Sequence, residues 1–117
     1  EDGRIGAFRT VMTGELFNLL KGHSILADFM RGEVEPNAAF TSGVAQGLAH
    51  DDLTAELFSI RARVLLGKAL AENAASYASG LLIGTDLRVG LRMAQDEAEI
   101  IVMGRPELTS LYAAALE

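Results

Sequence analysis

One short segment has the residue types needed to hold an anion at the start of a helix. Thr13-Gly14-Glu15 lies where an alternating apolar pattern gives way to a helical one. Free backbone N–H groups at such a turn can receive a carboxylate or a phosphate. An ordinary N-cap is the competing interpretation, because Thr13 is favoured there without any ligand.

A second segment, Gly104-Arg105, follows the compact apolar run Ile100–Met103 and precedes a predicted helix. A glycine in that position lets the backbone approach a flat ligand closely. A plain strand-to-helix turn would explain the same residues. The sequence therefore leaves both interpretations open.

Small residues at Ser76, Gly80 and Gly84 recur every four positions along a predicted helix. A glycine inside a helix costs about 0.5–1 kcal/mol relative to alanine, so this stripe needs a compensating role. Close packing against another helix is the favoured explanation, and close approach of a ligand is the alternative.

Several titratable residues are candidates for chemistry. Arg61 lies toward the apolar side of its helix, which favours a structural pair with an acid. His23 and His50 are the two histidines and cysteine is absent, so a histidine or thiolate metal site is not expected. Four carboxylates are each conceivable as the base that takes a proton from a hydroxyl group, namely Asp28, Asp52, Asp86 and Asp96.

The elements that must position these residues are mostly helical. A strand is predicted at Arg4–Val11, after the hairpin signal Asp2-Gly3, and a buried strand at Ile100–Met103. Two isolated strands are not stable, so we expect them to pair with other polypeptide or a second copy. Helices are expected after Thr13, Ser24 and Asn37, from Leu53 to Val64, from about Leu70 to Met93 with a break near Gly84–Asp86, and after Pro106.

Composition narrows the class of protein. The 117 residues are 50% hydrophobic with a net charge of −6, which suits one folded domain or part of one. The acidic balance argues against non-specific binding to nucleic acid or anionic membranes, but not against a nucleotide ligand. Neither a signal peptide nor a membrane-length apolar run is evident, so a soluble, cytoplasmic protein is expected.

Five ordered motifs carry a resemblance to a known family. The run F-R-T-V-M-T-G-E-L-F-N-L-L at 8–20 resembles F-x-T-x-M-T-G-E-L-F-x-L-L of the 2-dehydro-3-deoxygalactonokinases. The others are H-S-I-L at 23–26, L-F-S-I-R at 57–61, S-G-L-L-I-G at 79–84 and I-V-M-G-R-P-E-L-T-S-L-Y at 101–112. Together these motifs span nearly the whole sequence.

The resemblance implies an ATP-dependent sugar-acid kinase of the actin-like superfamily, using Mg²⁺ and acting on 2-dehydro-3-deoxy-D-galactonate in galactonate catabolism. It implies an α/β fold, with residues 1–117 forming a single incomplete domain, the helical part of the second, ribonuclease-H-like lobe. The phosphate-binding loops that resemble D-x-G-T and P-G-T-H-S-K-W in this family are absent. We therefore expect no kinase activity from these residues alone.

The resemblance also suggests roles for individual residues. Thr13, Gly14 and Glu15 would bind the sugar acid, with Glu15 on a hydroxyl group because it would repel the carboxylate. Residues Gly104, Arg105 and Gly84 would bind the nucleotide, while the catalytic base stays unknown and no metal ligand is expected. A non-catalytic helical binding or oligomerisation module is the alternative function.

Overall fold

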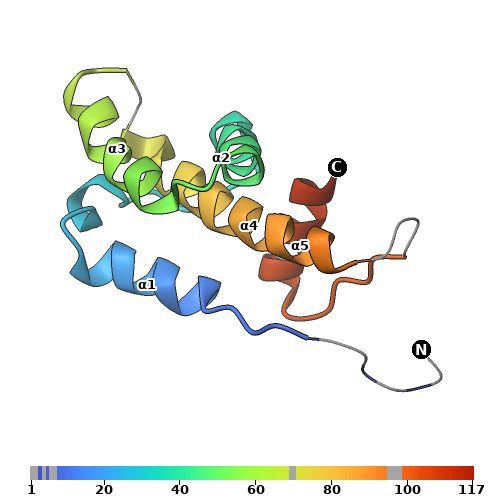
Figure 1. The fold of residues 1–117 in the computed structure, drawn as a ribbon. Coiled ribbons are helices and arrows are strands. Elements are labelled where there is room, and N and C mark those ends of the chain that lie inside the picture. The colour runs from blue at the N-terminus through green and yellow to red at the C-terminus, as the bar shows by residue number, and fades with distance from the viewer. Residues whose placement is uncertain (1–2, 4, 6–7, 69–70, 95–98) are drawn as a thin grey trace.

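The computed structural model describes residues 3, 5, 8–68, 71–94 and 99–117, which form an elongated helical body of 52 × 26 × 23 Å (Figure 1). Five α-helices and two short 3₁₀ helices follow one another along the described chain. They are α1 Thr13–His23, η1 Ala27–Phe29, α2 Ala38–Ala49, α3 Leu53–Leu65, η2 Ala71–Asn73, α4 Ala74–Met93 and α5 Pro106–Leu116.

Helix α4 is the centre of the molecule. All residues in its first half, from Ala74 to Gly84, are buried. Helices α1, α2, α3 and α5 each contact α4, which runs diagonally between them in Figure 1. The main core combines α4 with Leu26 and Met30 of the α1–α2 connection and with Leu57 and Ile60 of α3.

The stripe of small residues on α4 packs directly against α2. A Cβ atom added to Gly84 would lie 2.5 Å from the carbonyl oxygen of Val44, and one added to Gly47 would lie 2.5 Å from that of Leu81. Gly43 and Gly80 are equally crowded by backbone atoms of the opposite helix. The prediction of close helix packing along this stripe is therefore confirmed.

Ser76, the first residue of that stripe, has a different task. Its buried hydroxyl accepts a hydrogen bond from the Glu35 amide at 3.0 Å and donates to the Glu33 carbonyl at 3.4 Å. These bonds hold the loop before α2 against α4. A buried hydroxyl with both partners supplied by backbone costs little to desolvate.

Several predicted helix ends are confirmed. The Asn37 side chain caps α2 by accepting from the Phe40 amide at 3.0 Å, and Pro106 occupies the first turn of α5. Ser24 binds the Leu26 amide at 3.0 Å, although only one 3₁₀ turn follows it. The expected break near Gly84 is wrong, because α4 is continuous from Ala74 to Met93.

The two predicted strands are not present in the described residues. Residues 8–11 and 100–103 have no strand partner there, and a strand exists only as part of a hydrogen-bonded ladder. Ile101 and Met103 are 72% and 85% exposed, so this run is not buried by the described residues. The expected α/β class is thus corrected to all-helical for the part of the chain that is described. Asp2, Arg4 and Leu70 lie outside it.

None of the described helices is both long enough and apolar enough to span a lipid bilayer.

Candidate functional site

A pocket of about 430 Å³ opens between α1, α4 and α5, and we call it the α1–α5 pocket. Its polar lining combines hydroxyl, amide, guanidinium and carboxylate groups, and its apolar lining comes from all three helices and the loop before α2. The lining residues are Thr13, Gly14, Phe17, Asn18, Val34, Ser79, Leu82, Ile83, Arg105, Glu107, Leu108 and Leu111. Such a mixture of apolar walls with a few convergent polar groups is typical of small-molecule sites.

The structure brings together residues from both candidate segments of the sequence. Thr13 and Gly14 at the start of α1 line the same pocket as Arg105, which immediately precedes α5. Glu15 is exposed and is not among the lining residues. Gly104 has a φ of +148°, a backbone conformation that favours glycine and turns the chain into α5.

Gly84 does not belong to this site. Its α-carbon faces the Val44 backbone in the α2–α4 contact, where a ligand has no room to approach. Gly84 is buried, so close packing of α4 against α2 explains this glycine without the expected nucleotide contact.

Thr13 is not the ordinary N-cap of the competing interpretation. It is the first helical residue of α1, and Met12 occupies the cap position without a side-chain cap hydrogen bond. The Thr13 hydroxyl instead donates to Oδ2 of Asp86 on α4. The Tyr112 hydroxyl of α5 donates to the same oxygen at 2.8 Å. The Asp86 carboxylate on α4 thus connects the first residue of α1 to α5.

Burial and Asp86 together keep Tyr112 protonated. Burial raises the pKa of the Tyr112 phenol well above its ordinary value, and the hydrogen bond to Asp86 and the charge of that carboxylate raise this pKa further. A side-chain hydrogen bond with Thr13 lowers the pKa of Tyr112 and so opposes part of this shift. The raised pKa favours the protonated phenol, which is the form that donates to Asp86.

The structure also separates the candidate carboxylates from one another. Asp28 is exposed and pairs with Arg31 at 3.2 Å, and Asp52 is exposed at the start of α3. Asp86 is half-buried and lines a second pocket of about 300 Å³ that also includes Thr13. Asp96 lies outside the described residues. The sequence contained no signal for the role of Asp86, because its partners lie 73 and 26 positions away.

The remaining polar candidates are placed away from the α1–α5 pocket. Arg61 is half-buried on α3, and the ion pair of that helix is made by Arg63 with Glu56. His23 and His50 are both exposed. Within the described ranges, no three histidine, aspartate or glutamate side chains are grouped in a way that could hold a metal ion.

Comparison with known proteins points to a class of small-molecule kinases. The chain is 33% identical over 114 residues to the 2-dehydro-3-deoxygalactonokinase of Escherichia coli (strain K12), covering 97% of this chain and 39% of that protein. A Rhizobium meliloti (strain 1021) protein described as a 2-dehydro-3-deoxygalactonokinase is 35% identical over 121 residues, covering 99% of this chain and 39% of that protein.

A solved structure and a family model agree with these relatives. A Sinorhizobium meliloti protein, crystallised and assigned as a 2-dehydro-3-deoxygalactonokinase, superposes with a TM-score of 0.78 at 32% identity over 94% of this chain and 36% of its own. The model of the 2-keto-3-deoxy-galactonokinase family matches residues 1–117. The chain belongs to the 2-keto-3-deoxy-galactonokinase family. It spans about two fifths of the length of the curated relatives that it matches.

Proposed function

We propose that these residues form part of a sugar-acid kinase that transfers a phosphoryl group from ATP to 2-dehydro-3-deoxy-D-galactonate, a step of galactonate breakdown. One observation carries the proposal: Thr13, Gly14 and Arg105, which are far apart in the sequence, line one pocket. Family membership supplies the type of reaction, and the pocket supplies a place where two ligands can meet. The proposal places the enzyme in the cytoplasm, where ATP is available.

The start of α1 is assigned to the sugar acid. The first-turn amides of a helix attract an anion, so Gly14 and its neighbours suit the carboxylate of the substrate. Asn18 lies one turn further along the pocket wall and can bind hydroxyl groups. Glu15 is exposed, so it would reach a sugar hydroxyl from outside the described lining.

The start of α5 is assigned to the nucleotide. The Arg105 guanidinium can form paired hydrogen bonds with a phosphate group. Gly104 is not among the lining residues, but it directly precedes Arg105, and its backbone would permit close approach of a flat base or ribose. Leu82, Ile83 and Leu108 provide apolar surface for the base. The residues present therefore fit a nucleotide.

Magnesium ions, when bound to ATP, neutralise charge on the transferring phosphoryl group. The described residues contain no group of three acidic or histidine side chains that could hold a metal ion, and we assign no magnesium ligand among them. Asp86 is engaged by two O–H donors, so we assign it to positioning the two ligand-binding segments rather than to proton transfer. The actin-like, ribonuclease-H-like architecture of the second lobe is part of the same proposal.

Titration of the ¹⁵N-labelled chain with Mg-ATP and with the sugar acid tests the assignment. We expect ATP to shift the amide signals of residues 104, 105, 107 and 108 and the sugar acid to shift those of residues 13–18. Arg105→Gln should weaken ATP binding about tenfold, as loss of a charge-assisted contact predicts. Arg92→Gln, near the end of α4, is the matched control that removes the same charge outside the pocket lining.

Two outcomes would contradict the proposal. One is ATP binding that Arg105→Gln and Arg92→Gln change equally. The other is a stable dimer whose signals respond to neither ligand, which would favour the helical oligomerisation module. A coupled ADP-release assay should detect no turnover by the 117-residue chain, because charge neutralisation by phosphate loops is the main source of catalysis in kinases.

A further inference from the structure

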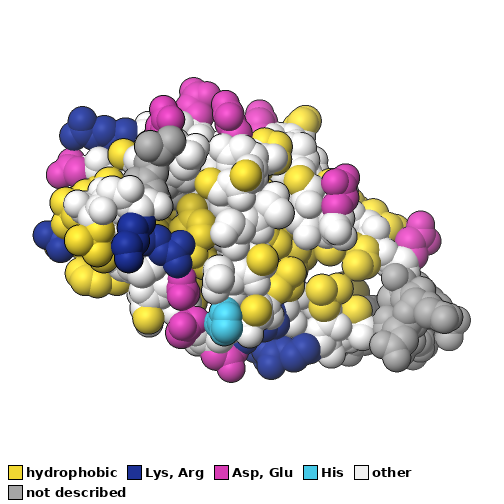
Figure 2. Space-filling model, turned by 90° about the horizontal axis from the view of Figure 1, so that it is seen from above, with side chains coloured by type: hydrophobic (Ala, Val, Ile, Leu, Met, Phe, Trp, Pro, Cys, Tyr) yellow, Lys and Arg dark blue, Asp and Glu magenta, His cyan; other side chains and the backbone are white. Residues whose placement is uncertain are grey.

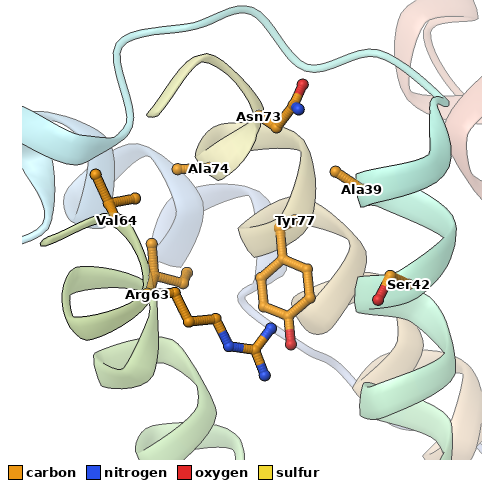
Figure 3. A pocket seen from close by; sticks show the side chains of 8 residues that line it. Ala39, Ser42, Arg63, Val64, Asn73, Ala74 and Tyr77 are labelled. Atoms are coloured by element: carbon orange, nitrogen blue, oxygen red, sulfur yellow. The ribbon is translucent and has the colours of Figure 1, made fainter. Parts of the chain in front are cut away.

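Another pocket, separate from the two already described, lies between α2, α3 and the start of α4, and we call it the α2–α3 pocket. It has a volume of about 200 Å³ and shares no lining residue with the α1–α5 pocket. Figure 3 shows the Arg63 and Tyr77 side chains extending between α3 and α2, with Ser42 on the facing helix. The lining residues are Ala39, Ser42, Ile60, Arg63, Val64, Asn73, Ala74 and Tyr77.

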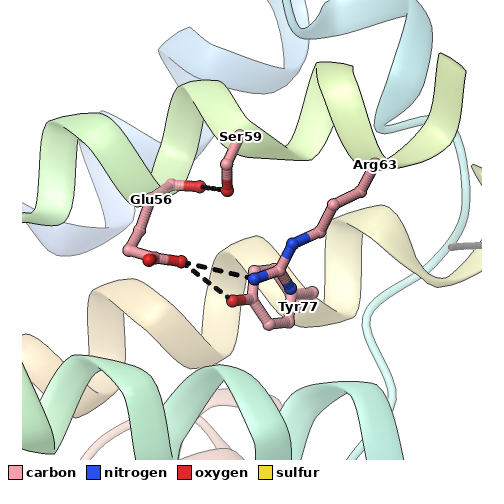
Figure 4. A network of polar contacts seen from close by, with 4 residues as sticks. All are labelled: Glu56, Ser59, Arg63 and Tyr77. Carbon is pink, nitrogen blue, oxygen red and sulfur yellow. Dashed lines mark hydrogen bonds and ion pairs between the residues drawn. The ribbon is translucent and has the colours of Figure 1, made fainter. Parts of the chain in front are cut away.

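Arg63 is held in place without using all of its hydrogen-bonding capacity. Its guanidinium carbon lies 5.0 Å from the centre of the Tyr77 ring, a cation–π distance. Its Nη2 atom lies 3.7 Å from Oε2 of Glu56, which is longer than a hydrogen bond (Figure 4). The side chain is 40% exposed, so its N–H groups can reach a ligand in the pocket.

Glu56 lies next to the pocket, where its carboxylate is close to both Tyr77 and Arg63. The Tyr77 hydroxyl donates to Oε2 of Glu56 at 3.2 Å, and Glu56 is not a lining residue (Figure 4). Burial raises the pKa of Tyr77, so its hydroxyl remains a neutral donor. Among the described lining residues, Arg63 alone is charged. Glu56 offsets part of this charge, and the Arg63 N–H groups that Glu56 does not engage remain available to a ligand.

We propose that the α2–α3 pocket binds a small monocarboxylate with a short apolar chain. The carboxylate pairs with the Arg63 guanidinium, and the Ser42 hydroxyl and Asn73 amide supply further donors. The carbon chain packs on Ile60 and Val64. This site is independent of the proposed kinase site, because the two pockets have different linings and lie against different parts of α4.

Propionate, with propionamide as its neutral counterpart of the same shape, tests the site in NMR titrations of the ¹⁵N-labelled chain. We expect propionate to give saturable shifts at residues 39–42 and 73–77 and to leave residues 13–18 and 104–108 unchanged. Propionamide should bind about tenfold more weakly or not at all, because it cannot pair with a guanidinium. This comparison needs no substitution and therefore does not depend on a variant that folds.

Two variants on α3 test whether the charge of Arg63 is responsible for propionate binding. Arg63→Gln should weaken propionate binding about tenfold, while Arg61→Gln removes the same net charge from α3 outside the lining and should leave it unchanged. Equal effects of the two variants, equal binding of propionate and propionamide, or shifts confined to the α1–α5 pocket would each overturn the proposal.

Discussion

At the scale of single residues, the least expected feature is the use of one carboxylate by three helices. Asp86 on α4 accepts hydrogen bonds from Thr13 of α1 and from Tyr112 of α5. Thr13 itself lines the α1–α5 pocket, and Tyr112 directly follows the lining residue Leu111, so Asp86 sets the spacing between α1 and α5 at the pocket. Local sequence patterns describe neighbours along the chain, and these contacts are all long-range. They could not have been predicted from the spacing of Thr13, Asp86 and Tyr112.

Replacing Tyr112 tests how much this contact contributes. Tyr112→Phe should lower the free energy of unfolding by about 1–2 kcal/mol, because it leaves a half-buried carboxylate with one donor fewer. Urea denaturation monitors the loss. Ser110→Ala is the control on the same helix, since the exposed Ser110 hydroxyl bonds only to the Glu107 carbonyl of its own helix, and its effect should stay within about 0.5 kcal/mol. Equal effects would contradict the role of Asp86.

The two tyrosines predict how stability changes in alkaline solution. Burial raises the pKa of both Tyr77 and Tyr112 above the ordinary value of 10.0. Above about pH 10 the unfolded chain loses phenolic protons that the folded chain retains, so stability falls as pH rises.

Urea denaturation between about pH 9 and pH 11 measures this dependence. The double variant Tyr77→Phe/Tyr112→Phe should lose stability less steeply than the unmodified chain, because both have the same lysines and differ only in the phenols. Parallel curves for the two proteins would show that the phenols have the same pKa in the folded and unfolded states.

At the scale of the elements, the helices were largely predictable and the strands were not. Capping at Asn37, the Pro106 start and the small-residue stripe are local signals, and the structure confirms each of them. The apolar runs at 8–11 and 100–103 predicted strands, but a strand depends on a neighbour that a local pattern does not specify. The sequence predicted two separate candidate segments, at 13–15 and 104–105. It did not predict that Thr13, Gly14 and Arg105 line one pocket.

Two glycines of α4 provide a matched test of the α2–α4 contact. Gly84→Ala should destabilise the protein by about 3 kcal/mol, since the new methyl group would overlap the Val44 backbone, which cannot move as a flexible side chain could. Gly90→Ala, in the same helix with open space around it, should stabilise by about 0.5–1 kcal/mol. Thermal unfolding of both variants measures the difference. A neutral Gly84→Ala would mean that the two helices are further apart.

At the scale of the whole molecule, large apolar side chains are exposed in the non-helical segments before α1 and between α4 and α5. Phe8 is 78% exposed and Met103 is 85% exposed. On the face shown in Figure 2, apolar side chains also appear in several places among acidic and basic ones. Exposed apolar surface of this kind favours association with other polypeptide.

We therefore expect the 117-residue chain to self-associate as its concentration rises, which static light scattering would detect. The double variant Phe8→Lys/Met103→Lys should reduce association and leave the unfolding temperature nearly unchanged, because neither side chain is buried. Phe58→Lys, at a 54% exposed site on α3, is the control and should have a smaller effect on association. Association that survives the double variant would have another origin.

The direct backbone contact between α2 and α4 has a consequence for how the molecule opens. Where glycines bring two main chains together, there is no layer of mobile side chains through which water could reach the amides. The amide protons of residues 80–84 should then exchange with deuterium more slowly than any others in the described chain, on the timescale of global unfolding. The middle of α4 would thus be the last part of this protein to come apart.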